Sequence, residues 1–260
     1  MRLLILLGGL LAAPAFAQVV GQPVDYEVDG QSFRGYVAYD TRWTTPRPGV
    51  LVVHEWWGHN AYARQRANML AGEGFVAMAL DMYGEGRNTG HPEQAKAFMQ
   101  AVTQQQGAVA RRFEAARALL ASRPGVRNDD IAAIGYCFGG GVVLNLARQG
   151  VDLDGVVSFH GSLGTENPAQ AGDRVTPMLV LNGEADPFVP PAQVKAFREE
   201  MRAAGADLTY VGYPGIQHSF TNPGADAVGA EYGLPLAYDR AADEDSWSRA
   251  LAFLRQRFDD

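Results

Sequence analysis

The chain of 260 residues contains a single cysteine, Cys137. A lone cysteine cannot form a disulfide within the chain, so no disulfide framework supports the fold. An unpaired thiol is also open to oxidation and to pairing with other molecules. Free cysteines are among the most buried residues. Cys137 is therefore either an inert core residue or a residue whose chemistry offsets this risk.

Clusters of basic residues are scarce as well. The 22 lysines and arginines are outnumbered by 29 acidic residues, which gives a formal net charge of −7. Basic side chains gather only in short pairs such as Arg111-Arg112. Proteins that bind nucleic acids depend on a basic surface that neutralises phosphates. We therefore expect no nucleic-acid partner.

The sequence also lacks a hydrophobic run of the roughly 20 residues that a membrane-spanning helix needs. An apolar run at residues 3–13 follows Arg2 and precedes the small-residue pattern Ala15-Phe16-Ala17. This arrangement is typical of a secretory signal peptide. We expect cleavage after Ala17 and a secreted or periplasmic protein without a stable membrane anchor. The alternative is an anchor that is retained.

Residues 18–260 are predicted to form a single domain, and we expect it to be a monomer. The sequence has 47% hydrophobic and 20% charged residues, as soluble globular proteins do, and no internal repeat or linker. After a hairpin at residues 24–39 that turns near Asp29-Gly30, apolar strands alternate with helices. This order predicts an α/β fold whose mostly parallel sheet is covered by helices on both faces. The predicted strands are residues 49–56, 75–82, 131–136, 155–160, 178–183 and 208–214. The predicted helices are residues 60–71, 92–125 as one helix or two, a helix after Cys137, 191–204 and 243–258.

Cys137 stands between a predicted strand and a predicted helix, in the stretch IAAIGYCFGGG. Ligands of α/β sheets bind beyond the carboxyl ends of the strands, which is where this turn lies. The spacing Gly135-x-Cys137-x-Gly139 matches the nucleophile elbow, in which the flanking glycines leave room for a strained turn. A helix N-terminus behind the sulfur favours the thiolate. The stretch fits neither a phosphate-binding loop nor a dinucleotide-binding motif.

A cysteine nucleophile needs a base, and the base needs an acid that orients it. In hydrolases with a nucleophile elbow, the chain order is nucleophile, acid, histidine. Asp186 follows the strand at residues 178–183, and His218 follows the strand at residues 208–214. Taken alone, Asp186 could be a turn or capping residue and His218 a surface histidine. Their order and their places at strand ends favour a triad of Cys137, Asp186 and His218.

The segments HEWWG, GYCFGG, GEADPFVP and GIQHSF resemble the dienelactone hydrolase family of α/β-hydrolases, over about residues 24–258. The resemblance implies an α/β-hydrolase fold in which Cys137 is the nucleophile, Asp186 the acid and His218 the base. It also implies that Glu55 interacts with the resting thiol and helps to form the thiolate when substrate binds.

The same segments bear on the oxyanion hole and on metals. By the resemblance, the backbone amides of Trp56 and Phe138 would form the oxyanion hole. His54 and His59 suggest a zinc motif, but the second histidine falls one residue too late for the helical H-E-x-x-H pattern, and His54 ends a strand. We therefore expect no metal and no cofactor.

The substrate-binding residues are where this chain departs from the family. By the resemblance, dienelactone hydrolase holds the lactone's carboxylate with arginines, one of them four residues after the catalytic histidine and another in the loop after the second buried strand. Here Asn222 takes the first place and Glu85 falls near the second. The alternative is that Arg87, with the loop shifted, or another base supplies the charge. We expect neutral esters or lactones to be preferred. The candidate pocket residues are Trp56, Trp57, Tyr83, Arg87 and Phe188.

The sequence thus predicts hydrolysis of a small-molecule ester or lactone through an acyl-thioester on Cys137. One alternative is a carboxylesterase of broad specificity that acts on neutral esters. A second alternative is a non-catalytic binding protein on a hydrolase scaffold, which would have no need to keep an oxidisable thiol. Asp81, His91 and His160 are interpreted as structural.

Overall fold

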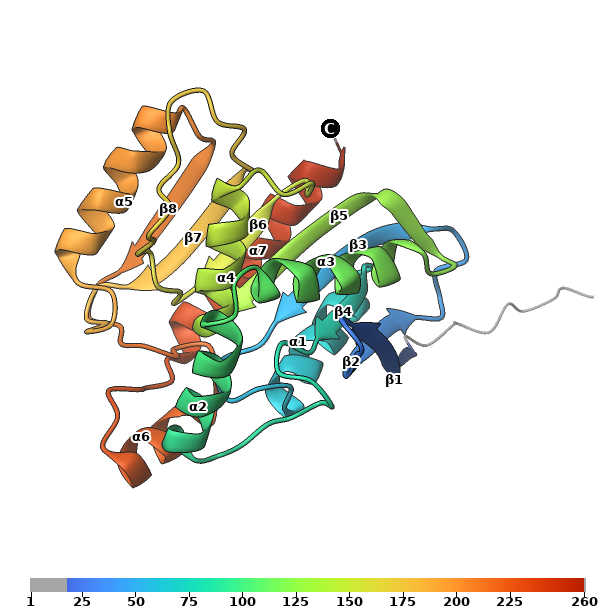
Figure 1. Cartoon of the computed structure of the whole chain (residues 1–260), viewed down its shortest axis with the longest axis horizontal. Coiled ribbons are helices and arrows are strands. Elements are labelled where there is room, and N and C mark those ends of the chain that lie inside the picture. Colours follow the sequence, from blue (N-terminus) through green and yellow to red (C-terminus); the bar gives the residue numbers. More distant parts are fainter. Residues whose placement is uncertain (1–17, 260) are drawn as a thin grey trace, which may run out of the picture.

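The computed structural model describes residues 18–259, and the predicted signal peptide lies outside them. An eight-stranded sheet with the order β1-β2-β4-β3-β5-β6-β7-β8 forms its centre (Figure 1). β1 and β2 form an antiparallel hairpin and β2 pairs antiparallel with β4, whereas every later neighbour in the sheet is parallel. The strands are β1 (Val19–Val28), β2 (Gln31–Asp40), β3 (Arg47–Val53), β4 (Val76–Leu80), β5 (Val126–Tyr136), β6 (Val156–Phe159), β7 (Met178–Gly183) and β8 (Leu208–Tyr213).

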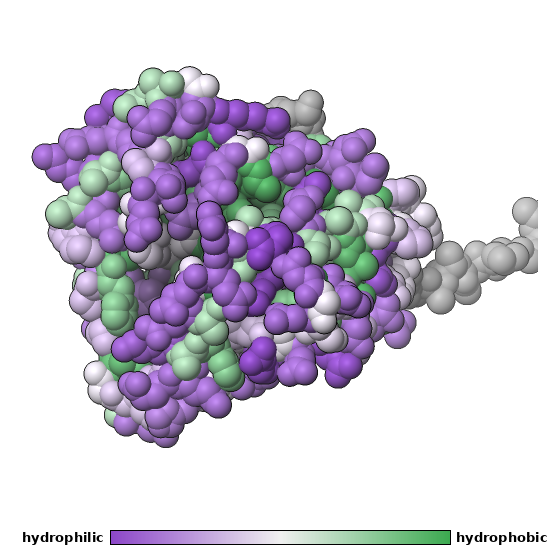
Figure 2. Space-filling model, in the orientation of Figure 1, coloured by the Kyte–Doolittle hydropathy of each residue, from purple (hydrophilic) through white to green (hydrophobic). Residues whose placement is uncertain are grey.

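Helices cover both faces of the sheet, which confirms the expected layer order. α3, α4 and α5 pack on one face, and α1 and α7 pack on the other. On the side of the molecule shown in Figure 2, hydrophilic side chains predominate and hydrophobic ones form small separate groups. The helices are α1 (Ala61–Gly72), α2 (Pro92–Thr103), α3 (Ala108–Ala121), α4 (Phe138–Arg148), α5 (Pro191–Ala204), α6 (Ala225–Tyr232) and α7 (Arg240–Asp259).

The central strands are apolar throughout because both of their faces are buried. In β3, Leu51 and Val53 join the core under α3 and α4, while Val50 and Val52 join the core under α1. Side chains alternate between the two faces of a strand, so a central strand needs an apolar residue at every position. This explains the near-continuous apolar runs of the sequence.

The structure corrects several predicted boundaries. β3 ends at Val53 instead of residue 56, because the carbonyl of His54 accepts from the amide of Gly139 in α4. Residues 92–125 hold two helices, since Gly107 has a left-handed backbone with φ of 70° before α3 begins. α7 starts earlier than predicted, with Asp239 accepting from the amide of Ala242. α6 was not predicted, because eight residues between glycines give too short a pattern.

No helix within residues 18–259 is long and apolar enough to cross a membrane.

Candidate active site

Five neighbouring strands each deliver one polar side chain to the same edge of the sheet. Parallel strands place their carboxyl ends together, so residues far apart in sequence meet there. The strands run in the order β3, β5, β6, β7, β8. The residues that follow them are Glu55, Cys137, His160, Asp186 and His218.

Cys137 occupies a sharp turn between β5 and α4. Its backbone has φ of 52° and ψ of −113°, a region that residues with side chains seldom adopt. A Cβ atom on Gly135 would collide with the backbone of Gly139, and one on Gly139 would collide with the carbonyls of Val53 and His54. The two glycines are therefore required by close packing, as the sequence predicted. The turn leaves Cys137 partly exposed at the N-terminus of α4.

His218 and Asp186 form a buried pair beside Cys137. His218 Nδ1 lies 2.7 Å from Asp186 Oδ2, and the amide of Phe188 donates to the other carboxylate oxygen at 2.8 Å. Burial alone would lower the pKa of His218, but the Cys137 sulfur and the Asp186 carboxylate together raise it to about 10. A ring held in this way by a carboxylate exposes Nε2 for proton exchange. The two residues that the sequence paired are thus in contact.

Glu55 is buried close to His218, and its side chain is hydrogen-bonded to the loop that follows His218. One carboxylate oxygen accepts from Ser219 Oγ at 3.1 Å, and the other accepts from Asn222 Nδ2 at 2.7 Å. Within residues 18–259, no hydrogen bond joins Glu55 to Cys137. Burial raises the pKa of Glu55, while the bonds from Asn222 and Ser219 oppose the rise. Asn222, which replaces the family's arginine, therefore serves as a partner of Glu55.

The backbone amides of Trp56 and Phe138 have no acceptor among residues 18–259. Phe138 is the first residue of α4, and Trp56 lies two residues after His54, whose carbonyl binds the same helix. The Phe138 amide lies at the N-terminus of α4, where amides are left without intrahelical partners. Together, the amides of Trp56 and Phe138 are suited to hold an oxygen that carries negative charge beside the thiol.

His160 lies behind the thiol and connects it to a buried polar network, which the sequence did not reveal. The Cys137 amide donates to His160 Nδ1 at 3.1 Å, and His160 Nε2 lies 2.8 Å from Thr221 Oγ1. Burial, with the charges of His218 and Arg66 nearby, lowers the pKa of His160 well below its ordinary value. The ring is therefore neutral, with Nδ1 as acceptor and the proton on Nε2.

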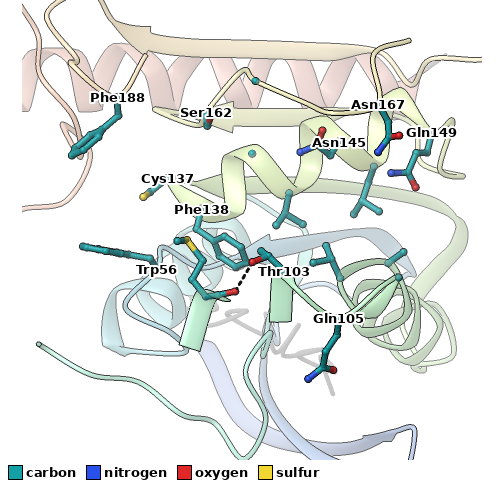
Figure 3. A pocket seen from close by; sticks show the side chains of 18 of the residues that line it. Trp56, Thr103, Gln105, Cys137, Phe138, Asn145, Gln149, Ser162, Asn167 and Phe188 are labelled. Carbon is teal, nitrogen blue, oxygen red and sulfur yellow. Dashed lines mark hydrogen bonds between the residues drawn. The ribbon is translucent and has the colours of Figure 1, made fainter. Parts of the chain in front are cut away.

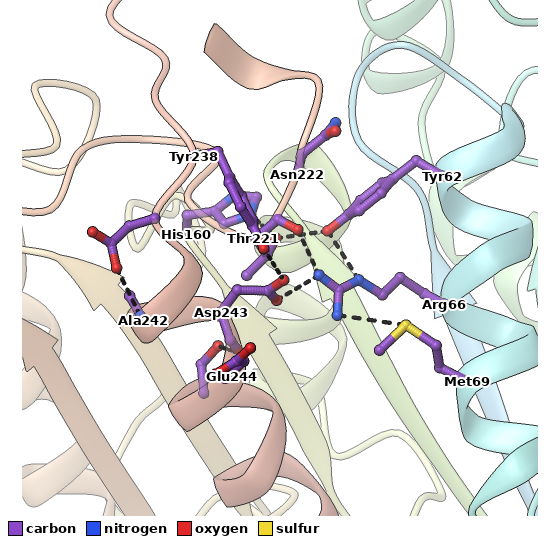
Figure 4. Close-up of polar contacts among 12 residues, drawn as sticks. Tyr62, Arg66, Met69, His160, Thr221, Asn222, Tyr238, Ala242, Asp243 and Glu244 are labelled. Atoms are coloured by element: carbon purple, nitrogen blue, oxygen red, sulfur yellow. Dashed lines mark hydrogen bonds and ion pairs between the residues drawn. The ribbon is translucent and has the colours of Figure 1, made fainter.

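The network continues to an ion pair between helices. Arg66 of α1 donates to the Thr221 carbonyl and to Asp243 of α7 (Figure 4). The Tyr62 hydroxyl lies 2.6 Å from Thr221 Oγ1 and accepts from Arg66 Nε. Because Thr221 is only three residues from His218, these contacts fix the position of the loop that carries His218. No sequence pattern links residues so far apart in the chain.

A pocket of about 660 Å³ opens beside Cys137. Figure 3 shows Cys137, Trp56 and Phe188 at one end, and Asn145, Gln149 and Asn167 gathered at the other. The pocket runs along α4, with α2, α3 and the loop after β6 forming its walls. Among residues 18–259, no aspartate, glutamate, lysine or arginine lines it.

Three of the candidate pocket residues lie outside this lining. Trp57 is buried against Ala95, Ala225 and Leu236. Tyr83 is buried, and its hydroxyl donates to the Trp56 carbonyl at 3.0 Å, so it supports the pocket wall from behind. Arg87 donates to the carbonyls of Gly84 and Tyr83 within its own loop. Arg87 therefore brings no charge to the pocket, whereas Trp56 and Phe188 do line it.

His54 and His59, whose spacing does not match the zinc motif, are each hydrogen-bonded to the protein backbone. His54 Nε2 accepts from the Met82 amide, and His59 Nε2 lies 3.1 Å from the Ala79 carbonyl. Across residues 18–259, no three histidine, cysteine or acidic side chains are grouped so that they could hold a metal ion. Asp81 accepts from three backbone amides of its own loop and from the amide of Arg34 in β2, which is a structural role.

Comparison with known proteins gives consistent matches over most of the chain. The model of the dienelactone hydrolase family matches residues 33–258. Protein usf of Aquifex pyrophilus is 29% identical over 245 residues, which cover 91% of this chain and 99% of the relative. A carboxymethylenebutenolidase-like protein of Escherichia coli strain K12 is 28% identical over 268 residues, with 94% and 93% covered.

Among solved structures, one similar protein is a dienelactone hydrolase-like promiscuous phosphotriesterase from metagenomic libraries. It is 34% identical, has a TM-score of 0.86, and the match covers 92% of this chain and 99% of that one. This likeness confirms the expected α/β-hydrolase fold.

Proposed function

This chain belongs to the dienelactone hydrolase family and is a hydrolase of esters or lactones; we propose that Cys137 is its nucleophile, His218 its general base and Asp186 the acid that orients the base. The observation that carries the proposal is the buried His218–Asp186 pair beside a thiol at a strained helix N-terminus. This is the combination that nucleophilic catalysis requires.

The first step is acylation of the enzyme. His218 holds the proton of Cys137, and the thiolate attacks the substrate carbonyl to give a tetrahedral intermediate. The amides of Trp56 and Phe138 donate to the oxyanion, and their lack of other acceptors supports this role. The intermediate collapses to an acyl-thioester as the alcohol leaves with the proton from His218.

The second step is hydrolysis of the thioester. Water enters the place of the alcohol, His218 removes its proton, and the hydroxide attacks the acyl carbon. The second tetrahedral intermediate releases the acid and restores the thiolate–imidazolium pair. No step calls for a cofactor.

Glu55 is proposed to position the base. Its carboxylate binds Ser219, the residue next to His218, and Asn222 at the far side of the same loop. The contact with Cys137 that the family resemblance implies would add a further partner to this carboxylate or replace one of the two. We expect Glu55→Gln to lower kcat and to change its pH profile, since a loop residue that merely maintained the fold would leave the profile unaltered.

The test compares hydrolysis of 4-nitrophenyl acetate by the wild type and by Cys137→Ala and His218→Ala. We expect no turnover without the thiol and a loss of at least about a hundredfold without the base. His91→Ala is a matched control, because His91 is exposed and lies outside the pocket. Iodoacetamide should modify one site and abolish activity, since the chain has one cysteine. Full alkylation with unchanged turnover would refute the proposal, and ester binding without turnover would favour a binding protein.

A second candidate activity is hydrolysis of neutral phosphotriesters. The similar phosphotriesterase is 34% identical, and the pocket here has no acidic, lysine or arginine side chain in its described lining, which suits a neutral phosphorus centre as well as a neutral ester. Release of 4-nitrophenol from diethyl 4-nitrophenyl phosphate, absent in Cys137→Ala, would establish it. A rate equal to that of the Cys137→Ala variant would exclude it.

We also propose that the enzyme acts outside the cytoplasm after removal of residues 1–17. The sequence pattern of this segment supports the proposal.

A further inference from the structure

The pocket is far longer than a small lactone, and one face of α4 forms its floor. The α4 residues that line it recur at helical spacing, from Phe138 at one end to the capping residue Gln149 at the other. They are Phe138, Gly141, Val142, Asn145, Leu146 and Gln149. From Cys137 to Gln149 the helix rises about 18 Å at 1.5 Å per residue.

The chemistry of the lining changes along this length. Near the thiol, Gly141 leaves space for a chain to pass. Farther along, Val142 and Leu146 line the pocket together with Met99 of α2 and with Val109 and Ala110 of α3. Such a stretch favours a hydrocarbon chain.

The far end carries uncharged amides. Asn145, Gln149 and Asn167 gather there (Figure 3). Asn145 Oδ1 accepts from Arg148, so its Nδ2 group is directed to other acceptors. Arg148 itself is buried and paired with Glu200 at 2.7 Å, which keeps its charge out of the pocket.

We propose that the substrates are neutral esters or lactones with a long acyl part, whose chain lies along α4 and ends in an uncharged hydrogen-bond acceptor beside Asn145. This inference rests on the proposed function. Asn145 lies eight residues after Cys137, which is about 12 Å of helix rise. Three backbone atoms of an extended chain span at most about 3.3–3.6 Å, so roughly 10 chain atoms reach Asn145 and roughly 15 reach Gln149. The acyl side is assigned because the alcohol must leave toward His218, close to the exposed Phe188 ring.

The first experiment measures kcat/KM for 4-nitrophenyl esters with acyl chains of increasing length, below their critical micelle concentrations. We expect a rise of about two- to fourfold per methylene, as for burial of a CH₂ group, until the chain fills the apolar stretch. Alkyl acetates of increasing alcohol length should show no such rise. A flat acyl series, or a rise only with alcohol length, would overturn the assignment.

The second experiment blocks the groove. Ala110→Trp fills the middle of the pocket from α3, and the ratio of kcat/KM for the dodecanoyl ester to that for the acetyl ester should fall at least tenfold. Ala101→Trp is the matched control, because Ala101 is exposed on α2 and outside the lining. An unchanged ratio in Ala110→Trp would overturn the proposal.

The third experiment tests the far end. Esters whose acyl chain ends in a methyl ether should be favoured over alkyl esters of equal length by about two- to tenfold, the usual range for one neutral hydrogen bond. Asn145→Leu should abolish that preference, and retention of the preference would refute the role of Asn145. Failure of the proposed function is distinguishable, since the wild type would then not hydrolyse even the acetyl ester.

Discussion

Replacing Asp186 by asparagine tests the geometry of the proposed triad at one atom. Both oxygens of Asp186 accept hydrogen bonds, one from His218 Nδ1 and one from the amide of Phe188. Asparagine has one acceptor oxygen and one NH₂ group. If the oxygen keeps the Phe188 amide, the NH₂ group faces His218 Nδ1 and selects the tautomer with the proton on Nε2. That tautomer cannot accept a proton from Cys137.

The size of the effect follows from the lost charge-assisted bond. A hydrogen bond to a charged group contributes about 1.5–3 kcal/mol. Since one pKa unit corresponds to 1.36 kcal/mol, the pKa of His218 should fall by about 1–2 units from about 10. The wrong tautomer adds to this loss, so we expect kcat to drop by about 10²–10⁴.

Nuclear magnetic resonance of protein labelled at histidine provides the direct assay, because the chain has only five histidines. The signal of His218 is the one missing from His218→Ala, and its titration midpoint should move down in Asp186→Asn. Asp152→Asn is the control, since Asp152 is exposed and remote from the pocket. An unchanged midpoint and an unchanged kcat would refute the reasoning. Glu184, the nearest other acid in the sequence, would then be the candidate partner.

Three further predictions concern substrate charge, acid stability and processing. Neutral lactones should exceed matched anionic lactones in kcat/KM by about ten- to a hundredfold; Asn222→Arg should not close this gap, because the new guanidinium would pair with buried Glu55, and a closed gap would show that it reaches the substrate. Burial lowers the pKa values of His54, His59 and His160, so between about pH 6.5 and pH 4 these histidines bind more protons in the unfolded chain than in the folded one. Their contribution should therefore make the free energy of unfolding, measured by urea titration, fall as the pH drops through this range. A constant free energy would contradict this. The intact mass of protein from its native host should correspond to a start at residue 18, and an unprocessed chain would argue against export.

The sequence predicted the sheet and the elbow, because each depends on local pattern. The contact of Asp186 with His218 was predicted from their order in the chain and their places at strand ends. Apolar strands and paired glycines are visible in short windows. The contacts of His160 with the Cys137 amide and of Asn222 with Glu55 were missed, because they join residues whose distance in space depends on the whole fold. The lining face of α4 could have been found from its helical spacing, but only once the opposite wall was known.

Because five adjacent strands each deliver one residue, enzymatic activity reports on the folding of the part of the sheet formed by β3, β5, β6, β7 and β8. The complete set extends from Glu55 to His218, so no fragment shorter than residues 55–218 contains it. Pairing of β3 with β5 cannot align the site until β7 and β8 have docked, so catalysis should return only at the end of refolding. Inactivation by denaturant should likewise coincide with global loss of structure. Partial unfolding at either end of this five-strand row should abolish activity.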